Sequence, residues 1–262
     1  MPYYITDDGI DIYYECIGNG EPLVFIHGLG ASSEMYKPQV EYFKKEFKVV
    51  IIDLRGNGKS GKLECLKDEV LDTQIKDVIQ ILDHLEIEQS SFVGVSYGGV
   101  FIQKFAITYP NVVNSLIISD SFCDTSTDSL QKALAMFGAK QTWILRLPNK
   151  WLAKLTTSSY KNWPLAGSEM KKVIVNMRKR ETILQRKTIN NIKLNNDLST
   201  LDVPVLCLVG DNTKLGIKMM EQVSNLTDGE LVVIEDSFDP SNLCQPTVFN
   251  TITHEFLQKV FS

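Results

Sequence analysis

The sequence predicts an α/β fold, in which a mostly parallel β-sheet carries helices on both faces. Short apolar runs alternate with helical stretches along most of the chain, and apolar runs of that length suit strands buried on both faces. The 262 residues suffice for one large domain with an insertion. With 44% hydrophobic and 23% charged residues, a disordered or collagen-like chain is excluded.

The first expected element is a β-hairpin. Tyr3–Thr6 and Ile10–Cys16 are β-prone and flank Asp7-Asp8-Gly9, where glycine tolerates the positive φ of a tight turn. Six more strands are expected from their apolar runs: Leu23–Ile26, Val49–Ile52, Phe92–Val95, Ser115–Ser119, Val205–Val209 and Leu231–Ile234. Four helices are expected between them: Glu69–Leu85, Gly98–Tyr109, Ile217–Asn225 and Thr247–Phe261.

The segment between Asp124 and Asn196 breaks this alternation. Its pattern is helical, and it contains all three tryptophans, Trp143, Trp151 and Trp163. We therefore expect a core domain of residues 1–123 and 197–262, with residues 124–196 inserted as a helical cap.

Charge is distributed unevenly between these two parts. The whole chain carries −5, which argues against nucleic-acid binding, but residues 132–195 carry +12 and the remainder carries −17. The basic excess can belong to solvated helix faces. It can also attract an anionic substrate, partner or membrane surface.

Cysteine and histidine usage argues against a disulfide framework or a metal centre. The five cysteines are scattered and odd in number, which is typical of reduced thiols, and three histidines are too few for a metal cluster. No apolar run approaches the about 20 residues of a membrane span, and the first nine residues show neither the basic nor the apolar region of a signal peptide. These features predict a cytoplasmic protein without a metal cluster.

The strongest chemical motif is Gly94-Val95-Ser96-Tyr97-Gly98. It follows a predicted strand and precedes a predicted helix, which is the context in which G-x-S-x-G forms a sharp turn that exposes the serine hydroxyl. The N–H groups at the start of the helix then point toward developing negative charge. Ser96 is therefore the candidate nucleophile.

Two other strand ends carry glycine-rich loops. In Phe25-Ile26-His27-Gly28-Leu29-Gly30, Gly28 lets the backbone approach a ligand, the N–H of Leu29 can join that of Tyr97 as an oxyanion hole, and His27 is better interpreted as a loop residue than as a base. In the loop from Asp53 to Ser60, an aspartate replaces the first glycine of a phosphate-binding motif, so we expect a loop that braces the floor of the pocket.

These three segments, in this order, resemble the α/β-hydrolase superfamily, of the capped esterase, lactonase and hydroxyacid-hydrolase type. The resemblance covers essentially the whole chain. It implies hydrolytic or acyl-transfer chemistry without a cofactor, with Ser96 as nucleophile and with Leu29 and Tyr97 as oxyanion donors. Trp143, Trp151, Trp163 and Phe137 are candidates to line the substrate pocket, beside His27 and Gly28.

The chain departs from the pattern of that superfamily at the catalytic base. Relatives carry Gly-His after the last strand, where this sequence has Phe238-Asp239. An ordinary carboxyl, with a pKa of about 3.9, is a poor base near neutral pH. His84 and His254 fall on predicted helices that should not reach the turn at Ser96.

The acid of the triad has two candidates. Thr213 occupies the usual position, with Asp211 two residues earlier, and Asp120 fits the alternative position at the end of the strand after the Ser96 helix. We rank Asp120 first.

Two functions from different classes follow. The first is a serine hydrolase of small carboxylic esters, lactones or thioesters, with a substrate that can be anionic. The alternative is a hydrolase scaffold without turnover that binds a small ligand or another protein. The sequence leaves the oligomeric state open.

Overall fold

A computed structural model describes residues 2–126 and 141–262. Its sheet has eight strands in the order β1-β2-β4-β3-β5-β6-β7-β8. The strands are β1 (Tyr3–Ile5), β2 (Asp11–Ile17), β3 (Glu21–Ile26), β4 (Phe47–Ile52), β5 (Ser90–Val95), β6 (Val113–Ser119), β7 (Val205–Gly210) and β8 (Glu230–Ile234).

The predicted hairpin and the predicted parallel strands are confirmed. β1 and β2 pair antiparallel and β2 pairs antiparallel with β4, whereas all strands from β4 to β8 across the sheet pair in parallel. Because the carboxyl ends of parallel strands meet at one edge, the loops that follow β3, β5, β6, β7 and β8 converge there.

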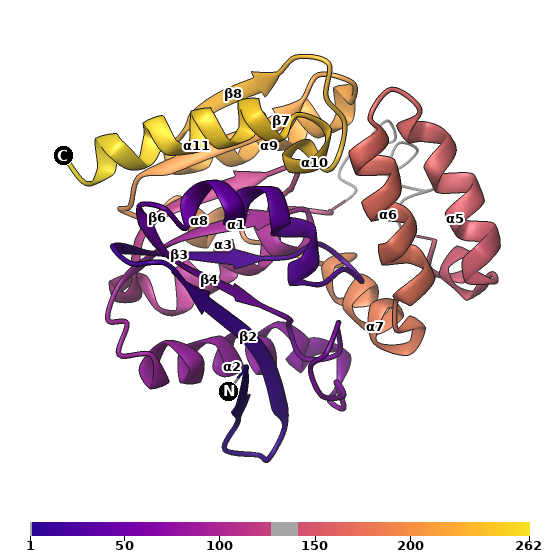
Figure 1. The fold of residues 1–262 in the computed structure, drawn as a ribbon, viewed down its shortest axis with the longest axis horizontal. Coiled ribbons are helices and arrows are strands. Elements are labelled where there is room, and N and C mark those ends of the chain that lie inside the picture. Colours follow the sequence, from indigo (N-terminus) through magenta and orange to yellow (C-terminus); the bar gives the residue numbers. More distant parts are fainter. Residues whose placement is uncertain (1, 127–140) are drawn as a thin grey trace.

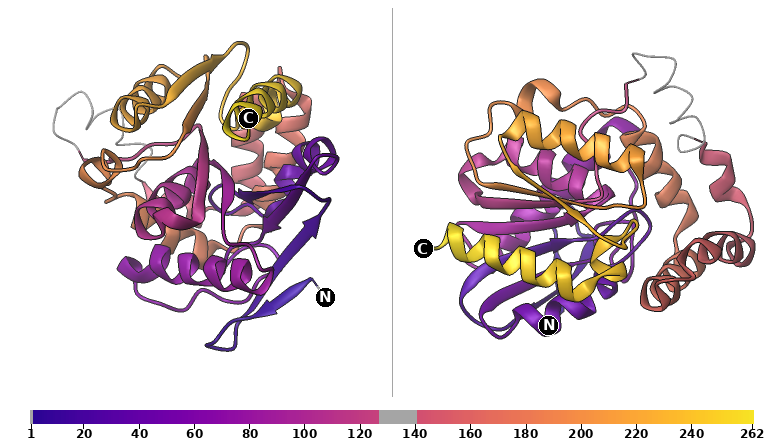
Figure 2. Two further views of the ribbon diagram at one scale, coloured as in Figure 1. Left: turned by 90° about the vertical axis from the view of Figure 1, so that its left-hand side faces the viewer. Right: turned by 90° about the horizontal axis from the view of Figure 1, so that it is seen from above.

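Helices cover both faces of the sheet, as predicted (Figures 1 and 2). The described helices are α1 (Lys37–Phe43), α2 (Val70–His84), α3 (Tyr97–Thr108), α5 (Asn149–Thr157), α6 (Pro164–Asn176), α7 (Lys179–Ile189), α8 (Asn195–Leu198), α9 (Lys214–Thr227), α10 (Ser241–Cys244) and α11 (Pro246–Val260). Short 3₁₀ turns are η1 (Ser33–Tyr36), η2 (Lys67–Glu69), η3 (Pro110–Val112), η4 (Thr142–Arg146) and η5 (Ser158–Tyr160).

Alternating strand residues feed two separate cores. Val24 and Ile26 of β3 pack into the core under α2, α3 and α9, whereas Leu23 and Phe25 pack on the opposite face under α1 and α11. This alternation follows from the two-residue period of a strand. The sequence prediction missed α1, a seven-residue helix with proline in its first turn.

The segment that the sequence predicts to be an insertion (residues 124–196, called the insertion below) separates β6 from β7, and its described part is helical from η4 to the start of α8. Its two ends lie side by side, because Asp124 and Lys193 form an antiparallel bridge and the N–H of Leu194 donates to the carbonyl of Cys123 at 2.9 Å. α5 and α6 stand beside the sheet, with α6 nearer to it (Figure 1).

Candidate active site

Ser96 lies on a sharp turn between β5 and α3. Its backbone has φ 54° and ψ −111°, a conformation that costs free energy and that packing must enforce. A Cβ on Gly98 would lie 2.0 Å from the carbonyl oxygen of Ile26, and one on Gly94 would lie 2.4 Å from that of Gly98. The small residues of the motif are therefore required by close backbone contact.

The backbone around Ser96 is fixed while its hydroxyl is left available. The N–H of Ser96 donates to the carbonyl of Ser119 at 2.9 Å, and the Ser121 hydroxyl donates to the carbonyl of Ser96 at 2.8 Å. Within the described part of the chain, the Ser96 hydroxyl has no hydrogen-bond partner of its own.

The loop after β3 passes directly beside this turn. A Cβ on Gly28 would lie 3.8 Å from the Cβ of Ser96 and 3.5 Å from the carbonyl oxygen of Val95. Among residues 2–126 and 141–262, the N–H groups of Leu29 and Tyr97 donate to no acceptor. Two donors are thus left without acceptors beside the serine, as an oxyanion hole would require.

Ser96 opens into a cavity of about 210 Å³ that also receives Asp120 from the end of β6 and Asp239 from the loop after β8. Arg186 of α7 and Asn190, which directly follows α7, line the cavity from the insertion. The other described lining residues are Ser121, Phe122, Thr125, Val209, Thr213, Leu215, Gly216, Met219 and Phe238.

Asp120 is held firmly by four hydrogen bonds. Its carboxylate accepts from the N–H and hydroxyl of Ser241 at 2.7 and 2.9 Å, from the N–H of Gly210 at 3.1 Å and from the hydroxyl of Ser119 at 2.9 Å. Burial raises the pKa of Asp120, and these hydrogen bonds oppose that shift. Four donors stabilise the ionised form of Asp120, so we assign the charge of the pair to Asp120.

Asp239 is the member that holds a proton at neutral pH. Burial raises its pKa to about 8, the negative charge of Asp120 acts in the same direction, and the positive charge of Arg186 opposes both. Burial in turn lowers the pKa of Arg186, while the charge of Asp239 raises it. Above about pH 8 the Asp239 carboxylate is a stronger base than an ordinary aspartate.

Asp211 lies outside this cavity. It is exposed, and its carboxylate accepts from the N–H of Ser237 at 3.1 Å and from the Asn212 side chain at 2.7 Å. The hydrogen bond from Ser237 lowers its pKa. Thr213 lines the cavity and caps α9 by accepting from the N–H of Gly216 at 3.0 Å. Of the two candidate acids, the fold therefore places only Asp120 beside Ser96 and Asp239.

None of the three histidines reaches the cavity. His27 is fully buried, with Nε2 accepting from the N–H of Leu54 at 3.0 Å and Nδ1 2.8 Å from the carbonyl of Gly28, so backbone groups occupy both ring nitrogens. His84 contacts the rings of Tyr4 and Tyr14, and His254 contacts Tyr42.

The three tryptophans predicted to line the pocket do not line this cavity. Trp143 is 59% exposed and outside the cavity. Trp163 is buried, donates its indole N–H to the carbonyl of Asp236 at 2.8 Å and stacks on Phe238, so it supports a lining residue without lining the cavity itself. Phe137 lies outside the described residues. Sequence reasoning missed Arg186, for which the basic excess of the insertion was the available signal.

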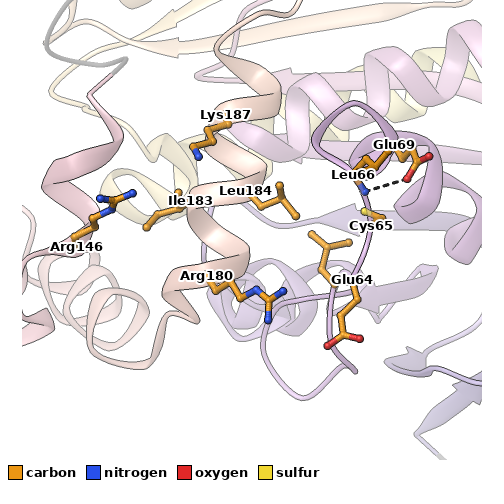
Figure 3. A pocket seen from close by; sticks show the side chains of 10 residues that line it. Glu64, Cys65, Leu66, Glu69, Arg146, Arg180, Ile183, Leu184 and Lys187 are labelled. Atoms are coloured by element: carbon orange, nitrogen blue, oxygen red, sulfur yellow. Dashed lines mark hydrogen bonds between the residues drawn. The ribbon is translucent and has the colours of Figure 1, made fainter.

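A larger hollow of about 790 Å³ lies between the loop before α2 and the insertion (Figure 3). Arg146, Arg180 and Lys187 face it from the insertion, opposite Glu64 and Glu69. Glu69 accepts from the N–H of Leu66 at 2.9 Å. This hollow contains neither a strained turn nor a serine, so the smaller cavity is the candidate active site.

The described residues show neither a metal-binding cluster nor a membrane span. No group of three or more histidine, cysteine, aspartate or glutamate side chains in residues 2–126 and 141–262 is placed to hold a metal ion. None of the helices described here is both long enough and apolar enough to cross a membrane.

Comparisons with known proteins agree on the family and the fold. A family model described as alpha/beta hydrolase fold matches residues 21–243. A 3-oxoadipate enol-lactonase of Acinetobacter baylyi is 32% identical over 119 residues, which is less than half of either chain. An (E)-2-((N-methylformamido)methylene)succinate hydrolase of the same organism is 24% identical, and the match covers 92% of both chains.

Solved structures extend the similarity over the whole length. A thermophilic esterase from Thermogutta terrifontis superposes with a TM-score of 0.84 at 23% identity, over 100% of this chain and 98% of that one. An enol-lactonase from Burkholderia xenovorans superposes with a TM-score of 0.81 at 19% identity, over 98% of this chain and 100% of that one. At these identities the superpositions show a shared fold.

Proposed function

The chain belongs to the alpha/beta hydrolase fold family, and from that premise we propose that it is a serine hydrolase of small carboxylic esters, lactones or thioesters. One observation carries the proposal: Ser96, held at φ 54°, opens into the cavity that also receives Asp120 and Asp239. The similar 3-oxoadipate enol-lactonase supports the lactone class of substrate.

In this proposal the Ser96 hydroxyl attacks the acyl carbonyl carbon. Its proton passes to the Asp239 carboxylate, and the N–H groups of Leu29 and Tyr97 stabilise the oxyanion. Collapse of the tetrahedral intermediate expels the alcohol or thiol, which takes the proton back from Asp239. Water then attacks the acyl-enzyme by the same route and releases the acid.

Asp120 has a positioning role in this scheme. Its charge keeps the pKa of Asp239 high, and its hydrogen bonds to Ser241 and Gly210 join the ends of β6 and β7 to the loop that carries Asp239. The reaction therefore requires alkaline pH, and its rate is expected to rise through about pH 8 as Asp239 loses its proton.

We also propose that the insertion acts as the cap of this cavity. The Tyr160 hydroxyl donates to the carbonyl of Asp239 at 2.6 Å, and Trp163 packs on Phe238. Both contacts join the insertion to the loop that carries the proposed base, and Arg186 and Asn190 supply one wall.

A second function is favoured by the burial of the Asp239 carboxyl group, which raises its pKa to about 8 and disfavours the carboxylate near neutral pH. Losing the base of a full triad costs about 10⁶ in kcat. A chain with this site can therefore bind an ester-sized ligand near neutral pH without appreciable turnover.

The test compares hydrolysis of p-nitrophenyl acetate by the unaltered chain, Ser96→Ala and Asp239→His, with Ser168→Ala on the exposed face of α6 as the matched serine control. We expect Ser96-dependent activity that rises toward alkaline pH, loss of that activity in Ser96→Ala, no effect of Ser168→Ala, and a gain in Asp239→His near neutral pH.

Two results separate the two functions. Activity that survives Ser96→Ala overturns the nucleophile assignment. If the unaltered chain shows no hydrolysis from pH 6 to pH 10 but binds an ester analogue saturably, the ligand-binding function is supported.

A further inference from the structure

One face of α5 exposes large apolar side chains between lysines. Trp151 is 68% exposed and Leu155 is 63% exposed, and they lie four residues apart, on one side of the helix. Lys150 and Lys154 precede them and are exposed as well. This face therefore presents two apolar and two basic side chains and no acidic one.

The opposite face of α5 anchors the helix to the rest of the insertion. Leu152 and Ala153 are buried together with Ile174 of α6. The exposed apolar residues are thus not needed to pack α5. In Figure 1, α5 lies on the far side of α6 from the sheet, so the core does not cover this face.

The surroundings of α5 are strongly basic. Residues 141–196 contain twelve lysines and arginines and two acidic residues, Glu169 and Glu181. Each acid is already within 2.7 Å of a basic side chain one turn away, Lys172 and Arg178 respectively. The remaining positive charge of this part of the chain is therefore not balanced by carboxylates of the insertion's described residues.

We propose that the exposed face of α5 docks on the surface of a bilayer that contains anionic lipids. Trp151 and Leu155 enter the boundary between headgroups and acyl chains, while Lys150 and Lys154 keep their ammonium groups at the level of the lipid phosphates. Tryptophan suits this boundary, since its ring is amphipathic.

Charge complementarity favours an anionic bilayer over a second copy of α5 or a nucleic acid as the partner of this face. A second copy of α5 would bring four lysines together without an acid to pair them, which costs free energy. A nucleic acid would match the lysines but leave Trp151 and Leu155 without an apolar partner. An anionic bilayer surface satisfies both kinds of side chain, and it requires no spanning helix.

The experiment measures sedimentation of the full chain with vesicles of phosphatidylcholine alone and of phosphatidylcholine with phosphatidylglycerol. We expect partition onto the anionic vesicles, a blue shift of tryptophan fluorescence, and weakening of both at high salt. Trp151→Phe is expected to remove the part of the blue shift that comes from α5, because Trp163 is buried and the other exposed tryptophan, Trp143, lies in η4, outside α5.

Two double variants test the face directly. Lys150→Gln with Lys154→Gln is expected to weaken partition about 30-fold, since each basic residue near an anionic surface contributes about 1 kcal/mol. Trp151→Ser with Leu155→Ser is expected to weaken it at least about 10-fold. The controls are Lys45→Gln with Lys218→Gln for the lysines, and Leu66→Ser for the apolar residues. All three positions are exposed and lie outside the insertion.

The variants change exposed side chains, and unchanged circular dichroism verifies folding. Three results overturn the proposal. They are equal partition onto neutral and anionic vesicles, an equal loss of partition in the control variants, and a dimer of the unaltered chain that Trp151→Ser with Leu155→Ser dissociates. The readout is independent of ester hydrolysis, so the inference stands or falls separately from the proposed function.

Discussion

Asp239 places a carboxyl group where it is costly to ionise. Burial and the charge of Asp120 both raise its pKa, to about 8, against an ordinary value of 3.8. Between these two values the folded chain holds a proton on Asp239 that the unfolded chain releases. Folded chains therefore bind more protons, and stability falls as pH rises from about 4 to about 8.

This residue-scale argument predicts the effect of Asp239→Asn on stability. The amide of the variant cannot ionise. At about pH 9 its unfolding free energy should therefore exceed that of the unaltered chain by on the order of 2–5 kcal/mol, whereas at about pH 4 the two should differ little. Urea unfolding at both pH values measures the difference.

Asp211→Asn is the control, because Asp211 is expected to change stability with pH in the opposite direction. The pKa of Asp211 is lowered in the folded chain, so its contribution is present above its ordinary pKa and is lost as pH falls below it. If Asp239→Asn raised the unfolding free energy equally at both pH values, Asp239 would not hold a proton in the folded chain as assigned.

At the scale of elements, Arg55 joins the hairpin, the loop after β4 and helix α2. Its guanidinium donates to Asp77 at 2.6 and 2.9 Å and to Asp8 at 2.6 and 2.8 Å, and its carbonyl accepts from Gln74 at 2.8 Å. The loop that follows β4 thus braces the hairpin against α2, and none of its residues lines the candidate cavity whose floor it was expected to support. Burial raises the pKa of Asp77 to about 6 even with Arg55 beside it.

Arg55→Met is therefore expected to destabilise the fold by about 3–5 kcal/mol, because it leaves Asp77 buried without its cation. Asp8→Asn is the control and should cost less than about 1 kcal/mol, since the Asp8 side chain is 57% exposed. Urea midpoints measure both. Combining Arg55→Met with Asp77→Leu should recover most of the loss, and a double variant as unstable as Arg55→Met alone would contradict the explanation.

At the scale of the whole molecule, the chain separates its charges between two parts. Residues 132–195 carry +12 against −17 elsewhere, and α7 of this basic segment supplies Arg186 to the cavity wall. The basic segment thus contributes a cation to the wall of the candidate active site, where positive charge can raise the encounter rate of anions.

This arrangement predicts a salt effect that depends on substrate charge. Between about 20 mM and about 500 mM salt, kcat/KM for an anionic ester such as p-nitrophenyl hemisuccinate should fall about 3–10-fold, and that for neutral p-nitrophenyl acetate should not change. Stopped-flow or steady-state assays measure both, with Asp239→His as the more active background. An equal salt effect on both esters would contradict electrostatic attraction.

The sequence alone determined the strands, the hairpin and the position of the sharp turn. These features depend on short-range patterns: apolar runs, an Asp-Gly turn, and small residues around Ser96 that the close contact of Gly98 with Ile26 requires. The short helix α1 was not predicted, because seven residues are too few to show a clear helical periodicity.

The tertiary structure decided which side chains meet. Asp120 and Asp211 were equal in chemistry, but the sheet brings only Asp120 to the cavity, whereas Asp211 caps the N–H of Ser237. Burial of His27, exposure of Trp143 and the approach of Arg186 to Asp239 depend on packing between segments far apart in the chain. Local sequence sets conformation, but the distance between two side chains and the pKa that results from it are set only when the whole chain has folded.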